Sequence, residues 1–239
     1  PVDHSMWQGQ IDGLAGECRV IAPDLRGFGR SSVTKGALTM GEMADDLDAM
    51  LDRLGIGERV VVCGLSMGGY VAFQFWARHA QRLGGLVLCD TRAAPDSPET
   101  AQARRATANQ VVAEGPQALV DGMIPKLFAK RTLAESPELI EQTRRVILAA
   151  SPEGIAAAAR GMAERPDMTP LLPQITCPAL LIVGSEDVIS TVEEMRTIAE
   201  RLPNARLVEI AGAGHMAPLE QPKTVNAAIR AWLAECVAG

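Results

Sequence analysis

Excess positive charge is absent from this sequence, whose 239 residues carry a formal net charge of −6. A chain without a basic field has no general attraction for phosphates, so nucleic acid and anionic membrane surfaces are not expected as partners. No apolar run reaches the roughly 18 residues that span a bilayer, and the sequence opens on no basic and apolar leader. We therefore expect a cytoplasmic protein that acts on a small neutral or apolar molecule, and we leave homo-oligomer formation open.

Paired cysteines are absent too. The five cysteines form no CxxC pair and follow no metal-ligand spacing. Cys63 and Cys89 stand inside apolar runs, where cysteine behaves as a small hydrophobe. We expect reduced and mostly buried thiols, as in a cytoplasmic protein, and neither a metal nor an organic cofactor.

What the sequence does contain is an alternation of two patterns. Short runs of Val, Ile and Leu end in Gly, Asp or Pro, and such continuous apolar character is typical of parallel strands covered on both faces. Between them lie segments with apolar residues at helical spacing. The alternation predicts an α/β fold with a mostly parallel central sheet flanked by helices. The expected strands span residues 18–22, 59–63, 86–89, 179–183 and 206–210, and the expected helices span 40–54, 70–79, 192–201 and 224–236.

One long stretch, residues 98–166, interrupts this alternation. It contains helical segments but no convincing strand, and prolines stand where its helices should begin. The stretch is also longer than a single crossover helix requires. We predict a helical cap over the carboxyl edge of the sheet, spanning residues 92–170, with residues 1–91 and 171–239 forming one core.

A glycine-rich turn joins an apolar run to the helix that follows it. Residues 64–68 read GLSMG, and the order strand, turn, helix is what gives a GxSxG pattern its meaning. Such a turn projects Ser66 above the sheet as a nucleophile, and we expect Gly64 and Gly68 to let strand and helix pack closely. The Met67 N–H, at the start of the helix, is predicted to bind the oxygen of a tetrahedral intermediate.

A serine hydroxyl needs a base to take its proton, and the sequence offers three histidines. His215 follows the last predicted strand, on a loop at the carboxyl edge where the active-site loops of an open α/β sheet lie. His79 falls at the end of the helix after Ser66, which favours a structural role. His4 is interpreted as a surface residue or a contact to substrate. His215 is therefore the predicted base.

The third member should be a carboxylate that orients the imidazole and stabilises its charged form. Asp187 follows a predicted strand through a short turn, at the same sheet edge as His215. Asp90 comes directly after another predicted strand, opens at that edge too, and is the alternative acid. Glu186 is expected to be a solvated turn residue. The predicted catalytic residues are Ser66, Asp187 and His215.

This serine turn resembles that of the α/β-hydrolase superfamily, and the resemblance extends over nearly the whole chain. Residues 22–31 (APDLRGFGRS) are similar to the family's strand-end loop, which implies that Asp24 and Arg26 brace this turn rather than react. The family's acid loop, histidine loop and last-helix opening are matched by residues 184–187, 214–215 and 220–222.

Members of this family normally carry a His-Gly loop after an early strand, and that loop supplies the second oxyanion N–H. The sequence has no such loop, and residues 1–7 resemble the segment that comes after it in the family. The resemblance implies that the preceding strand lies between the runs 18–22 and 59–63, so its absence leaves backbone groups unpaired. We expect the natural protein to carry roughly 20 to 30 further N-terminal residues, with this strand and the second donor. A strand swapped from another chain is the alternative.

Within the superfamily, the turn around Ser66 and residues 151–155 look most like 3-oxoadipate enol-lactonases and small carboxylesterases. The resemblance implies hydrolysis of a small carboxylic ester or lactone through an acyl-enzyme. An enol-lactonase would need a cation from the cap for its carboxylate-bearing lactone, and Arg144, Arg145 and Arg160 are available.

Other members of the superfamily catalyse different reactions at the same position. Serine-type haloperoxidases share the same triad, so peracid formation would be a side activity of the same site. Haloalkane dehalogenases and epoxide hydrolases need an Asp in place of Ser66 and are disfavoured. The chain could instead belong to a different class, either a non-catalytic module that binds a small ligand or an inactive fragment. The intact set of Ser, Asp and His disfavours both.

Overall fold

A single parallel sheet forms the centre of the computed structural model. The model describes residues 2–238, so Pro1, the first residue of the segment 1–7, lies outside the described residues. Its strands are β1 (Val60–Leu65), β2 (Leu83–Cys89), β3 (Ala179–Gly184) and β4 (Ala205–Ile210), in the order β1-β2-β3-β4. Strand β3 is buried along its whole length, as its unbroken apolar run requires. The predicted α/β fold with a parallel sheet is confirmed.

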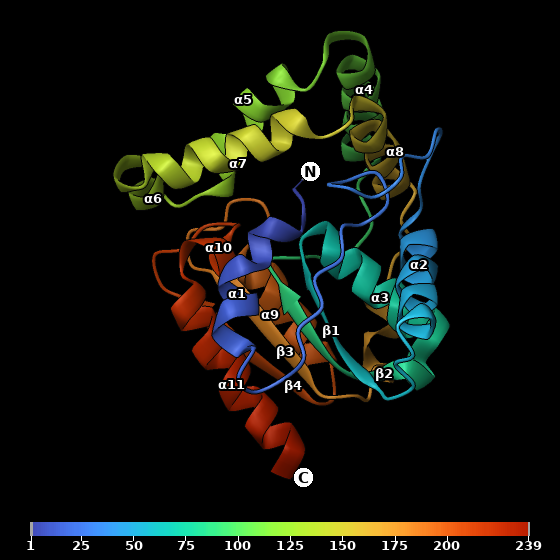
Figure 1. Cartoon of the computed structure of the whole chain (residues 1–239), viewed down its shortest axis with the longest axis vertical. Coiled ribbons are helices and arrows are strands. Elements are labelled where there is room, and N and C mark those ends of the chain that lie inside the picture. Colours follow the sequence, from blue (N-terminus) through green and yellow to red (C-terminus); the bar gives the residue numbers. More distant parts are fainter. Residues whose placement is uncertain (1, 239) are drawn as a thin grey trace.

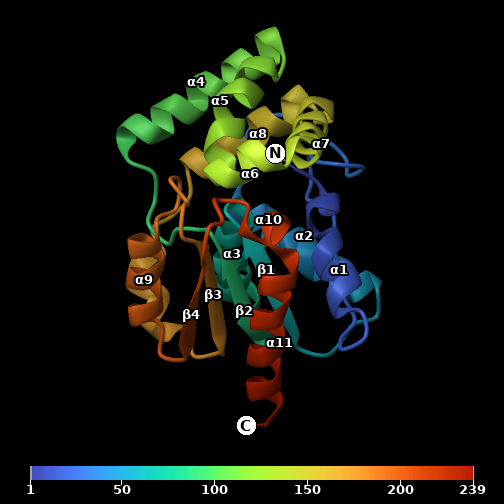
Figure 2. The same cartoon turned by 90° about the vertical axis from the view of Figure 1, so that its left-hand side faces the viewer.

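Helices cover both faces of this sheet (Figures 1 and 2). Side chains of β2 alternate between two cores, because successive residues of a strand point to opposite faces. Leu86 and Leu88 pack in the core that contains residues of α2 (Met40–Arg53), α3 (Met67–His79) and α9 (Val192–Arg201). Val87 and Cys89 pack in the core that contains residues of α1 (Gln8–Leu14) and α11 (Pro222–Ala238). The sheet is therefore the middle one of three layers.

The chain between β2 and β3 is helical, as predicted for residues 98–166. Pro98, Pro137 and Pro152 stand in the first turns of their helices, where a missing N–H costs nothing. Figures 1 and 2 show these helices together at the end of the molecule opposite the C-terminus. None of the described helices has both the length and the apolar stretch that a bilayer crossing requires. They are α4 (Pro98–Glu114), α5 (Gln117–Leu127), α6 (Lys130–Glu135), α7 (Pro137–Ala149) and α8 (Pro152–Ala163).

The strand predicted at residues 18–22 does not form, and this prediction is wrong for the described structure. A strand requires a neighbour for its backbone N–H and C=O groups, and no strand within residues 2–238 pairs with this run. Strand β1 is in consequence an edge strand, bonded on one side to β2. Val61 in β1 is 41% exposed, although its sequence context is that of an interior strand.

The expectation of mostly buried thiols is also wrong. All five cysteines are free, yet only Cys89 is buried; Cys177 is half-buried, and Cys18, Cys63 and Cys236 are exposed. Cys63 lies on the edge strand β1 and Cys18 begins the run that forms no strand, so no neighbouring strand among the described residues covers either side chain.

Candidate active site

The serine turn between β1 and α3 has an unusual backbone conformation. Ser66 adopts φ 53° and ψ −111° and is one of two non-glycine residues with positive φ in residues 2–238. Its N–H donates to the Cys89 carbonyl at 2.9 Å, and its own carbonyl accepts from Thr91 Oγ1 at 2.7 Å. Such strain persists only where the surroundings over-determine the conformation. The last residue of β2 and a residue just after it thus fix the turn through two hydrogen bonds.

Close packing at this turn explains one of the two predicted glycines. A Cβ on Gly64 would lie 2.2 Å from the carbonyl oxygen of Gly68, so only glycine fits there. A Cβ on Gly68 would meet no atom within 4 Å, and the predicted steric role of Gly68 is wrong. The second close approach is at Gly69 instead, where a Cβ would lie 2.3 Å from Thr91 Oγ1.

The acid and histidine loops meet at the carboxyl ends of β3 and β4. Nδ1 of His215 lies 2.9 Å from Oδ2 of Asp187, and both side chains are buried, with exposures of 4% and 0%. The other oxygen of Asp187 accepts the backbone N–H groups of Ile189 at 2.7 Å and Ser190 at 3.1 Å. Because Nδ1 is engaged by the carboxylate, Nε2 is the ring nitrogen left for the cavity.

A carboxylate that the sequence reasoning misses anchors the histidine loop. Glu220, at the end of α10 (Ala217–Glu220), accepts the N–H of Gly214 at 2.7 Å and the N–H of Ala129 at 3.0 Å. The sequence pattern marks residues 220–222 only as the opening of the last helix, which begins at Pro222. Glu220 therefore ties the residue before His215 to the helices between β2 and β3.

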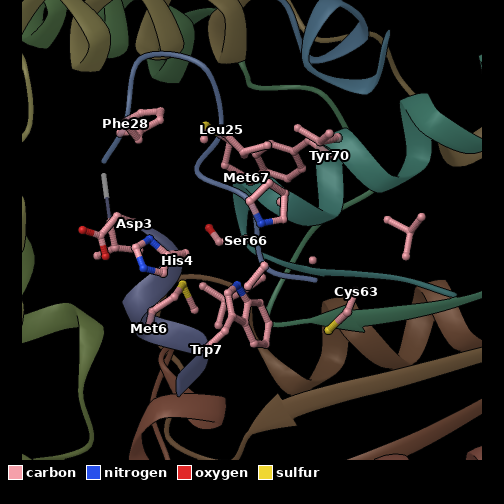
Figure 3. Close-up of a pocket in the computed structure, with 18 of the residues that line it drawn as sticks. Asp3, His4, Met6, Trp7, Leu25, Phe28, Cys63, Ser66, Met67 and Tyr70 are labelled. Carbon is pink, nitrogen blue, oxygen red and sulfur yellow. The ribbon is translucent and has the colours of Figure 1, made fainter. Parts of the chain in front are cut away.

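Ser66, Met67 and His215 line one cavity of about 900 Å³. Figure 3 shows Ser66 between the N-terminal segment that carries Asp3 and His4 and the helix that carries Tyr70. The described side chains form no hydrogen bond between Ser66 and His215. As the first residue of α3, Met67 has an N–H without an intrahelical acceptor, which suits the predicted oxyanion role. The second donor, expected before residue 1, falls outside the described residues.

The remaining histidines have carboxylate partners of their own. His79 ends α3, and its Nε2 lies 2.8 Å from Asp45, which agrees with the structural role predicted for it. His4 lies in the cavity wall with its Nδ1 2.7 Å from Asp24. Of the three histidines, only His215 combines a buried carboxylate partner on the acid loop with a place in the cavity wall.

Asp24 and Arg26 brace their loop, as the family resemblance implied. The Asp24 carboxylate accepts the N–H of His4 at 2.9 Å and the N–H of Arg30 at 3.0 Å, while Arg26 pairs with Asp46. Asp3, His4 and Asp24 also bring three potential metal-ligand atoms within 4.8 Å of one another. Because His4 and Asp24 already bond to each other, these contacts explain the cluster without a metal ion.

Two other carboxylates near the acid loop form no hydrogen bond with the imidazole among the described residues. Asp90, the alternative acid, is fully buried, and its Oδ1 accepts the Gly184 N–H at 2.8 Å. Glu186 is exposed, as predicted, and accepts the N–H of Lys130 at 3.2 Å. His215 is therefore bonded to Asp187 and to neither alternative.

A parallel α/β sheet with a serine turn, an acid loop and a histidine loop at one edge defines a hydrolase of the α/β class. The family described as "alpha/beta hydrolase fold" matches residues 1–222, and the chain belongs to it. The fold and the family resemblance predicted from the sequence are thereby confirmed.

Three relatives illustrate the similarity. A thermophilic esterase from Thermogutta terrifontis, solved with malate bound, is 52% identical with a TM-score of 0.97 over 99% of this chain and 87% of its own. The enol-lactonase from Burkholderia xenovorans is 33% identical with a TM-score of 0.90 over 98% and 87%. The 3-oxoadipate enol-lactonase 2 of Acinetobacter baylyi is 31% identical over 95% of this chain and 83% of its own.

Proposed function

We propose that this chain is a carboxylic ester hydrolase that cleaves small, uncharged esters through an acyl-enzyme on Ser66. The observation that carries the proposal is the buried Asp187–His215 pair, whose free ring nitrogen opens on the cavity that Ser66 also lines. Relatives named as an esterase and as enol-lactonases support the same reaction class.

Each group has one task in the proposed reaction. His215 Nε2 takes the Ser66 proton as Oγ attacks the ester carbonyl, and Asp187 stabilises the imidazolium that results. The Met67 N–H receives the oxyanion, and the alcohol leaves with the proton from His215. Water then attacks the acyl group with His215 as base, which releases the acid and restores Ser66.

The cavity wall favours an apolar substrate. Helices α4 and α8 contribute lining residues, which supports the proposal that residues 92–170 cap this site. The wall around the serine turn is largely apolar, so binding would come mainly from buried hydrocarbon surface. Its members include Leu25, Phe28, Tyr70, Ile155 and Met162.

The arginines of the lining offer little to an anionic substrate. Arg92 and Arg104 are each paired with a carboxylate, at 2.8 and 2.5 Å. Arg19 and Arg59 each begin an extended segment that leads toward the site. Arg59 is far from Ser66, because the six residues of β1 between them span about 20 Å.

The three cap arginines considered for a carboxylate-bearing lactone are engaged elsewhere. Arg144 lies 2.6 Å from Asp121, Arg145 lies 3.6 Å from Glu141, and Arg160 donates to Asn109 at 3.0 Å. None of the three is part of the cavity wall. A neutral ester therefore fits the site better than an anionic enol-lactone.

The test compares p-nitrophenyl acetate and butyrate, a neutral lactone, and a lactone with a free carboxylate. We expect kcat/KM for the neutral lactone to exceed that for the anionic one at least about tenfold, which is ~1.4 kcal/mol of differential binding. The Ser66→Ala variant should lose hydrolysis of all four compounds. Glu186→Gln, a change at an exposed neighbour of Asp187, should keep it and serves as the matched control.

Two results would overturn the proposal. Hydrolysis that survives Ser66→Ala would remove Ser66 as the nucleophile, and binding of esters without turnover would favour the non-catalytic module. A clear preference for the anionic lactone would instead replace the neutral ester by an enol-lactone as the substrate class.

A further inference from the structure

A second carboxyl group lies behind the acid of the proposed triad. Asp90 follows β2 directly, is 0% exposed, and with φ 47° shares positive backbone φ with Ser66 among the described non-glycine residues. Positive φ at such residues clusters at functional sites. This backbone conformation is therefore a reason to ask what the Asp90 side chain does.

The hydrogen bonds of Asp90 connect it to the loop that carries Asp187. Its N–H donates to the Ile182 carbonyl at 2.9 Å, and its Oδ1 accepts the Gly184 N–H at 2.8 Å. Oδ2 is buried and receives a hydrogen bond from no donor group in the described residues. A buried carboxylate oxygen without a donor is costly, whereas a protonated oxygen needs only an acceptor.

The acceptor next to it is Asp187. Gly184 connects the two residues, because its N–H bonds to Oδ1 of Asp90 and its carbonyl accepts the N–H of Asp187 at 3.1 Å. Two neighbouring carboxyl groups share a hydrogen bond only when one of them holds the proton. Asp187 already accepts two backbone N–H groups and bonds to His215, so both of its oxygens act as hydrogen-bond acceptors. The proton therefore belongs on Asp90.

The electrostatic surroundings agree with this assignment. Burial raises the pKa of Asp90 well above its ordinary value, and the charge of Asp187 raises it further, while the Gly184 N–H opposes the rise. The other titratable groups around it are Glu220 on α10, whose charge also raises the pKa of Asp90, and the buried thiol of Cys89.

We propose that Asp90 stays protonated at neutral pH and donates a hydrogen bond from Oδ2 to Asp187, as a positioning residue for the acid of the triad. The inference rests on the proposed function, because it assigns Asp187 the role of acid. This role accounts for the place of Asp90 directly after β2, at the carboxyl edge of the sheet, although Asp187 is the proposed acid. A neutral Asp90 holds Asp187 from behind without adding a second negative charge beside the imidazole.

Two substitutions of Asp90 distinguish a role as hydrogen-bond donor to Asp187 from a role as a negative charge. Asp90→Asn keeps an oxygen for the Gly184 N–H, puts an NH₂ group where the O–H stood, and tolerates positive φ. We expect it to keep kcat/KM for p-nitrophenyl acetate within about threefold, with the acid limb of the pH profile unmoved. Asp90→Ala removes the donor to a charged group, and we expect a loss of about 10- to 100-fold.

A spectroscopic measurement makes the result independent of turnover. In the Ser66→Ala background at pH 7, infrared difference spectra with and without Asp90→Asn should show one protonated carboxyl band lost with Asp90. This readout still applies if Asp90→Ala fails to fold or if the chain hydrolyses no ester, so failure of the proposed function is distinguished from failure of this inference. The absence of such a band, an acid limb shifted to lower pH in Asp90→Asn, or full activity in Asp90→Ala would overturn it.

Discussion

Replacing Gly64 by alanine tests whether the serine turn depends on close contact between β1 and α3. The added methyl carbon would lie 2.2 Å from the Gly68 oxygen and 2.3 Å from its carbonyl carbon, whereas ordinary contacts begin at 3.4 Å. Both atoms belong to the backbone of α3, so strand and helix must separate by about 1 Å. Overpacking of this kind costs about 1 to 3 kcal/mol.

The same separation displaces Ser66, which lies between the two contacting residues. Displacement of a catalytic group by about 1 Å can cost on the order of 100-fold in rate. We expect Gly64→Ala to lower kcat on p-nitrophenyl acetate by about this factor. Its melting temperature should fall by about 2 to 4 °C for each kcal/mol of destabilisation.

Gly68→Ala is the matched control, since its methyl carbon meets no atom within 4 Å. Alanine is favoured over glycine inside a helix by about 0.5 to 1 kcal/mol, so its melting temperature should be equal or higher. Melting temperatures and initial rates of both variants, measured in parallel, check the argument. Equal damage by the two substitutions, or no damage by Gly64→Ala, would refute it.

Three further predictions concern carboxylates. Asp187→Asn should lower kcat about 10⁴-fold while the protein stays folded, because an amide selects the wrong tautomer of His215; wild-type turnover in this variant would remove Asp187 from the triad. Asp90→Asn should be more stable than the parent, and the difference should grow as pH rises from about 4 to the folded pKa of Asp90, because over this range the unfolded parent loses a proton that the folded parent keeps. If urea unfolding gives the same difference in free energy at pH 5 and pH 8, this reasoning is wrong. Hydrogen bonds with Arg78 hold the pKa of Asp45 at about 2, so this carboxylate contributes stability above pH 4 that is lost as pH falls through 2. Asp45→Asn should therefore lower the free energy of unfolding by about 0.5 to 1 kcal/mol at pH 7 and by less at pH 3. An equal loss at both pH values would argue against the ion pair.

The sequence predicts the parts of the site that depend on local patterns. The turn around Ser66 combines a strand, two glycines and a helix within a few residues, so its place in the fold follows from neighbours along the chain. Asp187 and His215 each follow a strand of a parallel sheet, and the carboxyl ends of parallel strands lie at one edge. Their hydrogen bond is a consequence of that topology.

Contacts between distant segments cannot be derived in the same way. Thr91 and Glu220 hold the serine turn and the histidine loop, but nothing near them in sequence indicates which backbone group they meet. The sequence pattern assigns Gly68 a steric role that belongs to Gly69, because the side from which Thr91 approaches depends on the strand β2. The run 18–22 has the composition of a strand, and composition alone supplies no partner.

The unpaired side of β1 in residues 2–238 has a consequence for which segments can extend the sheet. An edge strand with free N–H and C=O groups is a template on which any extended backbone can add itself, whatever its side chains. Val61 and Cys63 lie exposed on this strand, without the charge or proline that usually guards such an edge. A segment that adds to this edge would therefore pair with the same strand that ends at the serine turn.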